Sequence, residues 1–191
     1  MATCPWPSSD PLMIAYHDSE WGTPVHDDRT WFEFIVLDAF QAGLSWRTVL
    51  HKRENFRAAF DQFEPAVVAR YSEEKILKLM QDAGIIRNQL KIRSAVINAH
   101  AFLRVQEEFG SFDRYIWGFT DGKVVHSHLD DLKGMPARTE LSDRISKDLI
   151  KRGFKFVGST IVYAFLQAAG VVNDHVTGCF RYKELINQYP E

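Results

Sequence analysis

Lys151-Arg-Gly-Phe-Lys-Phe-Val-Gly-Ser-Thr160 is a segment in which one helix is expected to end, the chain to turn and a second helix to begin. Gly153 and Gly158 bracket the turn and permit backbone conformations or a close approach that a side chain would block. Backbone N–H groups at the start of the second helix can bind a phosphate. With the nearby lysine and arginine side chains, these features suit a helix-hairpin-helix that grips a DNA backbone. An ordinary αα-hairpin with a glycine at the helix end fits the segment as well.

Apolar residues recur at spacings of three and four along most of the chain, which predicts a mainly helical fold. The stretch 120–139 lacks this pattern and contains turn residues, so we expect a surface loop there, with room for a brief hairpin. The fold class predicted is a compact all-α bundle. Helices are expected over residues 28–42, 46–60, 73–83, 91–109, 112–119, 142–152 and 159–169, with a short one that begins at 65.

The composition limits the kind of protein this can be. The 191 residues are 46% hydrophobic and 13% aromatic, enough to form the core of a single domain over residues 1–191. A net charge of −2 argues against nonspecific wrapping of nucleic acid, although a local basic patch remains compatible with it. No apolar run approaches the ~20 residues of a spanning helix, and the first residues lack the pattern of a signal peptide. We expect a cytoplasmic protein that does not contact membranes.

The only two cysteines lie near opposite ends of the chain, and each has a histidine nearby in sequence. Cys4 is followed by His17, and His175 precedes Cys179 by four residues, a spacing that places both ligands on one face of a helix. Together the four residues predict one tetrahedral Cys₂His₂ zinc site joining the two ends of the chain. Two buried free thiols are an alternative, and a disulfide is formally possible.

Aromatic residues gather around the first Cys/His pair. Trp6, Tyr16 and Trp21 flank it in a segment with little helical patterning, and an aromatic cluster near a carboxylate suits a cationic planar ligand. The candidate carboxylate is Asp38, which stands among apolar neighbours and must face a pocket or a partner if it is buried. The sequence is equally compatible with a second interpretation, in which the aromatic residues belong to the core and Asp38 points to solvent.

Gln41-Ala-Gly-Leu-Ser-Trp46 joins two predicted helices by a polar and apolar turn. Leu44 and Gln41 at such a tip can enter a base stack as a wedge. They can equally be routine loop residues.

Several ordered motifs resemble those of one family, and they span the chain from residue 4 to about residue 180. They are Cys4-Pro-Trp6, Asp10-Pro-Leu-Met-Ile-Ala-Tyr-His-Asp-Ser-Glu-Trp-Gly22, Gln41-Ala-Gly-Leu-Ser-Trp46, Lys52-Arg-Glu-Asn55, Gln81-Asp-Ala-Gly-Ile-Ile-Arg87, Lys151-Arg-Gly-Phe-Lys-Phe-Val-Gly158 and Val172-Asn-Asp-His-Val176. The chain resembles the bacterial Tag-type 3-methyladenine DNA glycosylases of the helix-hairpin-helix glycosylase superfamily.

The resemblance implies a site and a structural metal. One Zn²⁺ per chain would join the segments 1–26 and 170–185 through Cys4, His17, His175 and Cys179. The base would be bound by Trp6, Met13, Tyr16, Trp21, Asp38 and Trp46. DNA would be contacted by Gln41, Gly43, Leu44, Gly153, Lys155, Gly158 and Ser159.

Two positions depart from the family pattern. Members usually carry glutamate where this chain has Asp38, whose side chain reaches about 1.5 Å less far. Members often carry a second tyrosine where this chain has Met13, so one stacking face is replaced by a flexible side chain. Both departures predict that base affinity or lesion preference differs from the family type.

The activity implied is hydrolysis of the N-glycosidic bond of 3-methyladenine in double-stranded alkylated DNA by a monomeric enzyme associated with the nucleoid when acting. The alkylated base is cationic and leaves easily, so extrusion into an aromatic cleft can suffice, with Asp38 as the catalytic residue that hydrogen-bonds the edge of the base. No lysine is singled out as a nucleophile, which predicts a monofunctional enzyme without strand cleavage.

Asp174, beside His175, is expected to support the metal ligand, and a direct catalytic role is its second interpretation. Two further functions are compatible with the sequence. One is a glycosylase with a different lesion preference, and the second is a non-catalytic, zinc-stabilised DNA-binding module.

Overall fold

Most helices begin at a residue whose side chain accepts a hydrogen bond from the first turn, which explains where the chain starts each one. A computed structural model describes residues 3–190; the predicted domain also includes Met1, Ala2 and Glu191, which lie outside the described residues. The capping residues are Asp10, Asp27, Ser45, Ser72, Asn88, Ser111 and Thr139.

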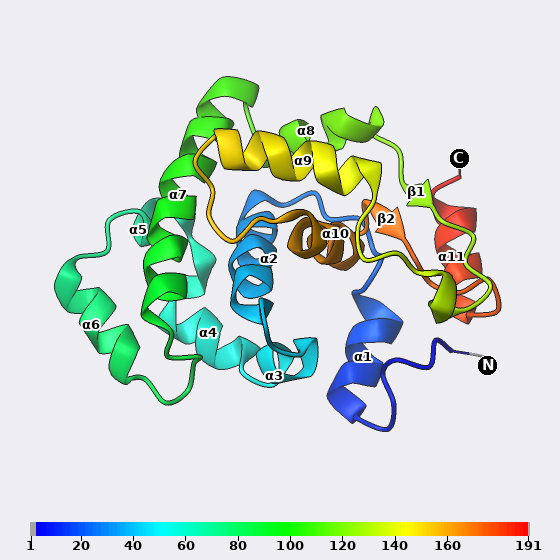
Figure 1. The fold of residues 1–191 in the computed structure, drawn as a ribbon, viewed down its shortest axis with the longest axis horizontal. Helices are drawn as coiled ribbons and strands as arrows, with labels where there is room; N and C mark the ends of the chain where they lie inside the picture. Colours follow the sequence, from blue (N-terminus) through cyan, green and yellow to red (C-terminus); the bar gives the residue numbers. More distant parts are fainter. Residues whose placement is uncertain (1–2, 191) are drawn as a thin grey trace.

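The fold is mostly helical, as predicted (Figure 1). Its elements are α1 (Pro11–Ser19), α2 (Asp28–Gln41), α3 (Trp46–Leu50), α4 (Arg53–Ala59), η1 (Asp61–Phe63), α5 (Pro65–Val68), α6 (Glu73–Gln81), α7 (Gln89–Phe109), α8 (Phe112–Trp117), η2 (Gly118–Thr120), β1 (Val125–His126), η3 (Leu132–Gly134), α9 (Glu140–Lys151), α10 (Ser159–Ala168), β2 (Val172–Asn173) and α11 (Phe180–Gln188). Among residues 3–190, no helix combines the length and the apolar composition needed to cross a membrane.

Helix α10 lies at the centre of the molecule, packed against α2 and α9 (Figure 1). Trp31 of α2 contacts Phe165 of α10, with ring centroids 5.4 Å apart. Phe102 of α7 stacks on Phe112 of α8 at 4.3 Å and is fully buried. These large apolar side chains explain why the helices hold together, since most helical stability in proteins comes from packing of the apolar faces.

The structure corrects the predicted elements in four places, one of which is α11, a helix that the sequence pattern did not predict. Residues 46–60 form two helices, α3 and α4, because the chain turns at His51 and Lys52. The N-terminal aromatic segment contains a helix, α1, which its cap Asp10 and the proline at its first position could have revealed. The irregular stretch 120–139 forms no hairpin; its strand β1 pairs in parallel with β2, far away in sequence.

Gly170 follows α10 at the point where the chain segment 22–25 crosses. It adopts φ +71°, and a Cβ there would overlap the backbone of Thr23 and Pro24. On either side of this contact the Val25 N–H donates to the Ala169 carbonyl and the Gly22 N–H to the Gln167 carbonyl, both at 3.0 Å. The absence of a side chain at 170 therefore lets the segment that leads from α1 to α2 lie against the end of α10.

We expect Gly170→Ala to lower the free energy of unfolding by more than about 2 kcal/mol, because it adds a left-handed backbone penalty to an overlap with main-chain atoms. Gly118→Ala is the matched control, since its φ is −61° and no atom lies within 4 Å of the added carbon. Urea unfolding of both variants measures the difference. Equal stabilities would contradict this account of the contact.

Candidate functional site

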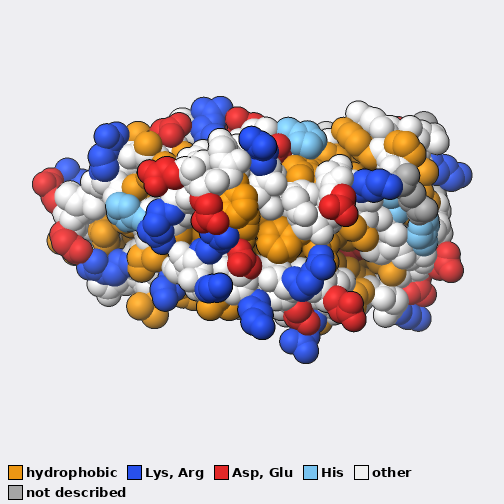
Figure 2. Space-filling model, turned by 90° about the horizontal axis from the view of Figure 1, so that it is seen from above, with side chains coloured by type: hydrophobic (Ala, Val, Ile, Leu, Met, Phe, Trp, Pro, Cys, Tyr) orange, Lys and Arg blue, Asp and Glu red, His pale blue; other side chains and the backbone are white. Residues whose placement is uncertain are grey.

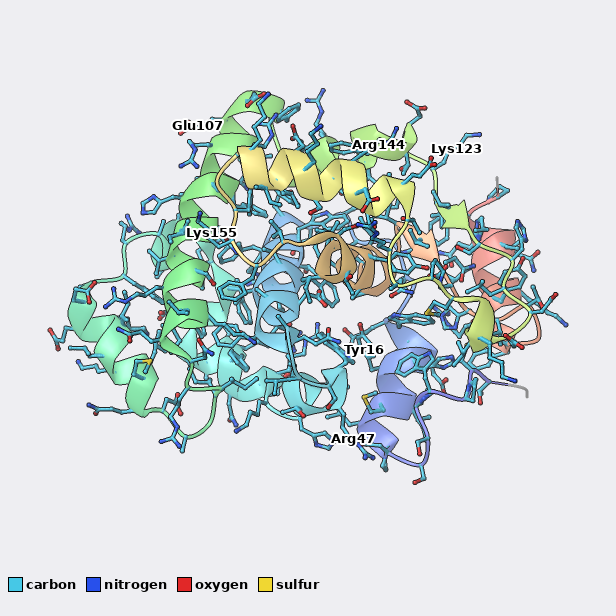
Figure 3. The ribbon with its side chains drawn as sticks, viewed as in Figure 1. Tyr16, Arg47, Glu107, Lys123, Arg144 and Lys155 are labelled. Carbon is cyan, nitrogen blue, oxygen red and sulfur yellow. The ribbon has the colours of Figure 1, made fainter. Side chains whose placement is uncertain are left out.

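A cavity of about 210 Å³ opens between α1, α2, α3 and α10. Figure 3 shows Tyr16 on α1 facing the gap between α1 and α3, with Arg47 at its lower edge. The lining residues are Trp6, Tyr16, Trp21, Asp38, Gln41, Trp46, Leu132, Met135, Ala164, Gln167 and Ala168. Five of the six residues predicted to bind a base are thus brought together, and Met13, buried on α1, is not among the lining residues.

The aromatic side chains of the cavity contact one another and form a continuous wall. The rings of Tyr16 and Trp46 lie 5.2 Å apart across the gap between α1 and α3. Trp6 makes edge contacts with Trp21 at 5.0 Å and with Tyr16 at 6.3 Å. Because each ring is held by another, the wall can receive a flat ligand without first becoming ordered.

Three buried polar atoms of the cavity have no hydrogen-bond partner among the described residues. They are the indole N–H groups of Trp6 and Trp46 and the carboxyl Oδ2 of Asp38. A buried polar atom without a partner is costly, and three around one cavity indicate a site built for a polar ligand. Such a ligand would supply acceptors for the two N–H groups and a partner for the carboxyl group.

Asp38 is fully enclosed on α2, so the interpretation in which it points to solvent is wrong. Burial raises the pKa of Asp38 well above its usual range, and the charge of Arg53 acts in the opposite direction. Arg53 is itself committed to Glu33 at 2.5 Å and Glu20 at 2.6 Å. Asp38 therefore faces the cavity as a carboxyl group whose neutral form is favoured.

Helices α1 and α3 are joined beside the cavity by an ion-pair cluster that the sequence pattern did not predict. Asp10, the buried N-cap of α1, accepts hydrogen bonds from Arg47 at 2.5 Å and His51 at 2.7 Å. These bonds hold the pKa of Asp10 below its usual range. The cluster fixes Tyr16 opposite Trp46.

Five further lining residues were not predicted from the sequence. Ala164, Gln167 and Ala168 lie on α10, and Leu132 and Met135 come from the irregular stretch 120–139. The helical period of α10 predicts which residues share a face, but nothing in the sequence shows that this face meets α1 and α2. The stretch 120–139 reaches the cavity because β1 is paired with β2.

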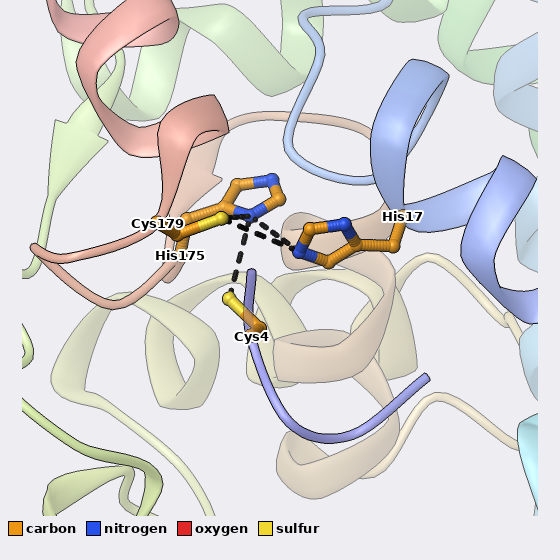
Figure 4. A group of neighbouring side chains, drawn as sticks. All are labelled: Cys4, His17, His175 and Cys179. Atoms are coloured by element: carbon orange, nitrogen blue, oxygen red, sulfur yellow. Dashed lines mark hydrogen bonds between the residues drawn. The ribbon is translucent and has the colours of Figure 1, made fainter. Parts of the chain in front are cut away.

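Cys4, His17, His175 and Cys179 lie together and are fully enclosed (Figure 4). Each cysteine sulfur is 3.6 Å from the His175 Nδ1, and the His17 Nε2 is 3.6 Å from the Cys179 sulfur and 3.2 Å from the His175 Nδ1. Both thiols are free, so the disulfide interpretation is wrong. The expected helical placement of His175 and Cys179 is also wrong, because both precede α11 and Cys179 is its N-cap.

The two histidine rings of this cluster are oriented by outside partners. His175 Nε2 lies 2.9 Å from the Trp21 carbonyl, and His17 Nδ1 lies 2.6 Å from the Asp18 carboxylate. Each acceptor fixes the N–H on that side of the ring, which leaves the second ring nitrogen as a lone pair facing the cluster. Burial lowers the pKa of His175 to about 4 and raises the pKa of Cys4 to about 12.

The turn between α9 and α10 is held by α7. The buried Asn98 accepts from the Lys155 N–H at 2.7 Å and donates to the Lys155 carbonyl at 3.1 Å. Gly153 has φ +96°, as the prediction required, whereas Gly158 has φ −61° and open space around it, so the structure itself does not demand glycine there. Gly158 caps α10 without a side-chain hydrogen bond, and Ser159, the first residue of α10, is tied to Ser142 at 2.8 Å.

The free positive charge near the turn between α9 and α10 is smaller than the sequence suggested. Arg152 is bound to Glu108 and Asp148, each at 2.6 Å, and only the neighbouring lysines remain exposed. Figure 3 shows Lys155 at the turn, beside α7. Figure 2 shows basic and acidic side chains intermixed over one face, with hydrophobic side chains near its middle, in agreement with the net charge of −2.

The turn after α2 contains the predicted wedge. Leu44 is 44% exposed, and its N–H donates to the carbonyl of Gln41, which lines the cavity. Gly43 has φ +78°. An exposed leucine thus stands beside the cavity on a tight turn.

The chain is similar to methyladenine glycosylases over nearly its whole length. The family model for methyladenine glycosylases matches residues 6–182. DNA-3-methyladenine glycosylase 1 of Escherichia coli (strain K12) is 50% identical over 182 residues, 95% of this chain and 97% of that protein. A crystal structure of 3-methyladenine DNA glycosylase I is 51% identical with a TM-score of 0.91, covering 94% of this chain and 98% of that one. A tyrosine-to-phenylalanine variant of 3-methyladenine DNA glycosylase I in complex with 3-methyladenine is 33% identical, also with a TM-score of 0.91, covering 94% and 97%.

We expect Asp38→Asn to stabilise the protein more at pH 7.5 than at pH 5.5. Because burial raises the pKa of Asp38, the folded protein keeps this proton after the unfolded chain has released it. The free energy of unfolding of the unaltered protein therefore falls by about 1.4 kcal/mol per pH unit as the pH rises above the pKa of an ordinary aspartate. The fall ends where the pH passes the pKa of Asp38 in the folded protein. Asparagine does not titrate, so Asp38→Asn removes this loss of stability at the higher pH.

Urea unfolding at both pH values measures the effect. Glu107→Gln, which removes an exposed acid of α7, is the control and should give the same difference at both. A gain from Asp38→Asn that is independent of pH would show that Asp38 titrates normally in the folded protein.

Proposed function

The chain belongs to the methyladenine glycosylase family, and from this premise we propose that it hydrolyses the N-glycosidic bond of 3-methyladenine in alkylated DNA and leaves an abasic site. The observation that carries the proposal is the aromatic cavity with three buried polar atoms that lack partners among the described residues. An alkylated purine is flat, cationic in DNA and edged with hydrogen-bonding atoms, so it satisfies both the wall and the polar atoms.

The aromatic wall favours the damaged base over a normal one. Tyr16, Trp46 and Trp6 present ring faces and edges to the cavity, and a positively charged base gains a cation–π attraction there that a neutral base lacks. The base must be extruded from the duplex to reach these rings. The same positive charge weakens the glycosidic bond, so departure of the base as a neutral molecule requires no strong acid.

Asp38 is the residue we assign to the base edge. A buried neutral carboxyl group can donate to a ring nitrogen and accept from an amine, whereas the indole N–H groups of Trp6 and Trp46 can only donate. As a positive charge develops on the sugar, the carboxyl group is also available as a nearby ionisable partner. Its shorter reach than the usual glutamate is the reason to expect a different base affinity.

DNA contacts are proposed for two turns. The α10 amides at Gly158 and Ser159 begin a helix without a side-chain cap, which suits a backbone phosphate. The open space at Gly158 gives a phosphate close access, and Lys155 adds charge. Leu44 and Gln41 would fill the gap left in the duplex by the extruded base. We propose that the protein acts as a monomer on double-stranded DNA of the nucleoid, in the cytoplasm.

A structural zinc ion is proposed for the Cys/His cluster. Tetrahedral zinc with bonds of about 2.0–2.1 Å to nitrogen and about 2.3 Å to sulfur requires N···S separations of about 3.5 Å, and three N···S separations in the cluster are 3.6 Å. The lone pairs of His17 and His175 face the cluster, and a dication would favour the thiolate forms of Cys4 and Cys179. Bound there, the ion would hold the segments 1–26 and 170–185 together.

The test of the activity is a single-turnover assay on duplex DNA that contains 3-methyladenine, with the released base detected by chromatography. We expect release by the unaltered protein, a loss of about a hundredfold in Asp38→Asn, and retained or faster release in Asp38→Glu, whose longer acid matches the family type. Glu107→Gln is the control and should act normally. DNA binding without base release would support a non-catalytic module, and a borohydride-trapped adduct would refute the monofunctional assignment.

Elemental analysis of the purified protein is expected to find one zinc per chain. Cys179→Ser should lose the metal and unfold at a lower temperature, because structural zinc contributes several kcal/mol to folding. His100→Ala, at an exposed histidine of α7, should retain both metal and stability. A metal-free protein with the same melting temperature before and after treatment with a chelator would overturn this proposal.

A further inference from the structure

Gln167 of α10 lines the cavity, and its side-chain amide is held by two neighbours. Its Nε2 donates to the Asp174 carboxylate at 2.6 Å and lies 3.3 Å from the sulfur of Met135. The residue is only 8% exposed. Both N–H groups of the amide are therefore occupied within the protein.

Asp174 determines which way the amide is turned. Asp174 is fully enclosed, and its Oδ2 accepts from both the Tyr163 hydroxyl and the Gln167 Nε2. The Gln167 nitrogen, and not its oxygen, lies against this carboxyl oxygen, and flipping the amide would place two oxygens together. Both hydrogen bonds of the Gln167 side chain use its nitrogen, so its carbonyl oxygen has no hydrogen-bond partner among residues 3–190 and is retained for a ligand.

An acceptor in this cavity can distinguish adenine from guanine. In DNA, 3-methyladenine carries one hydrogen-bond donor group, the 6-amino group, because N9 bears the sugar and N3 the methyl group. Guanine has a carbonyl oxygen at position 6, which would face the amide oxygen as a second acceptor. A site built to accept a hydrogen bond rejects an analogue that cannot donate it.

We propose that Gln167, oriented by Asp174 and Met135, is a specificity-determining residue that accepts a hydrogen bond from the 6-amino group and favours N3-alkylated adenine over N3-alkylated guanine. The inference rests on the proposed function and adds the residue that selects the purine. It also gives Asp174 a role: that of a positioning residue, acting through Gln167. The 6-amino group has two N–H bonds, so the Gln167 carbonyl and the Asp38 carboxyl group can each accept a hydrogen bond from it at the same time.

The experiment measures the ratio of 3-methyladenine to 3-methylguanine released from one sample of methylated duplex DNA. Gln167→Met keeps the approximate size of the side chain and removes its amide, so the ratio should fall about tenfold, the effect of one lost hydrogen bond. Gln106→Met is the matched control. Gln106 donates to Asp28 at 2.6 Å in the same kind of pair, but it lies on α7 and does not line the cavity. Its ratio should be unchanged.

Two further measurements keep the inference open to refutation. Met135→Leu frees one N–H of Gln167 and leaves the hydrogen bond between Gln167 and Asp174 intact. It should also lower the ratio of 3-methyladenine to 3-methylguanine, but by a smaller factor than Gln167→Met. Binding of free 3-methyladenine and 3-methylguanine, followed by quenching of tryptophan fluorescence, should show the same loss of preference in the absence of DNA. Thermal unfolding of each variant separates this effect from a loss of folding.

The outcomes distinguish the inference from the function on which it rests. If the unaltered protein releases 3-methyladenine and Gln167→Met and Met135→Leu both retain its ratio, the role of Gln167 is wrong and the activity stands. If the unaltered protein neither releases nor binds either base, the proposed function fails and the inference fails with it. A ratio that falls in Gln106→Met as much as in Gln167→Met would attribute the effect to structure and overturn the inference.

Discussion

The crossing of the segment 22–25 over the end of α10 is the contact on which the site depends. It is possible because Gly170 has no side chain and adopts a left-handed conformation, and two main-chain hydrogen bonds secure it. The crossing positions α1, which precedes it, beside α10. Two groups of residues follow from that placement: Tyr16 and Trp21 at the cavity, and His17 at the Cys/His cluster. One backbone contact therefore supports both the proposed base pocket and the proposed metal site.

Three of the buried polar atoms without partners among the described residues lie around the cavity. The buried Arg53, by contrast, is paired with Glu33 and Glu20. At Asp38 one oxygen has no partner among the described residues, and burial favours the neutral form of the carboxyl group. A carboxyl group in this state costs stability without a ligand and gains hydrogen bonds with one. The same physical argument explains the raised pKa and the preference for a ligand that can both donate and accept.

Much of the fold and part of the site could be predicted from local patterns. Capping residues such as Ser45 and Ser72 fixed where helices begin, since a cap acts on its own first turn. The aromatics Trp6, Tyr16 and Trp21 could be selected by their clustering around the first Cys/His pair. Gln167 and Met135 could not, because their roles depend on which elements meet at the cavity. The helical placement of His175 and Cys179 was wrong because a spacing of four also fits a loop that leads into a helix.

By itself the sequence determined the helical composition, some of the capping residues, the four metal-ligand candidates and the acid at position 38. These are properties of residue type and short spacing, which act over one or two helical turns. The tertiary structure alone decided that Asp38 is enclosed, that Arg152 is committed to ion pairs, and that the amide nitrogen of Gln167 is bonded to Asp174. Burial and hydrogen-bond partners come from residues distant in the chain, so the chemistry of each of these groups depends on the packing of helices around it.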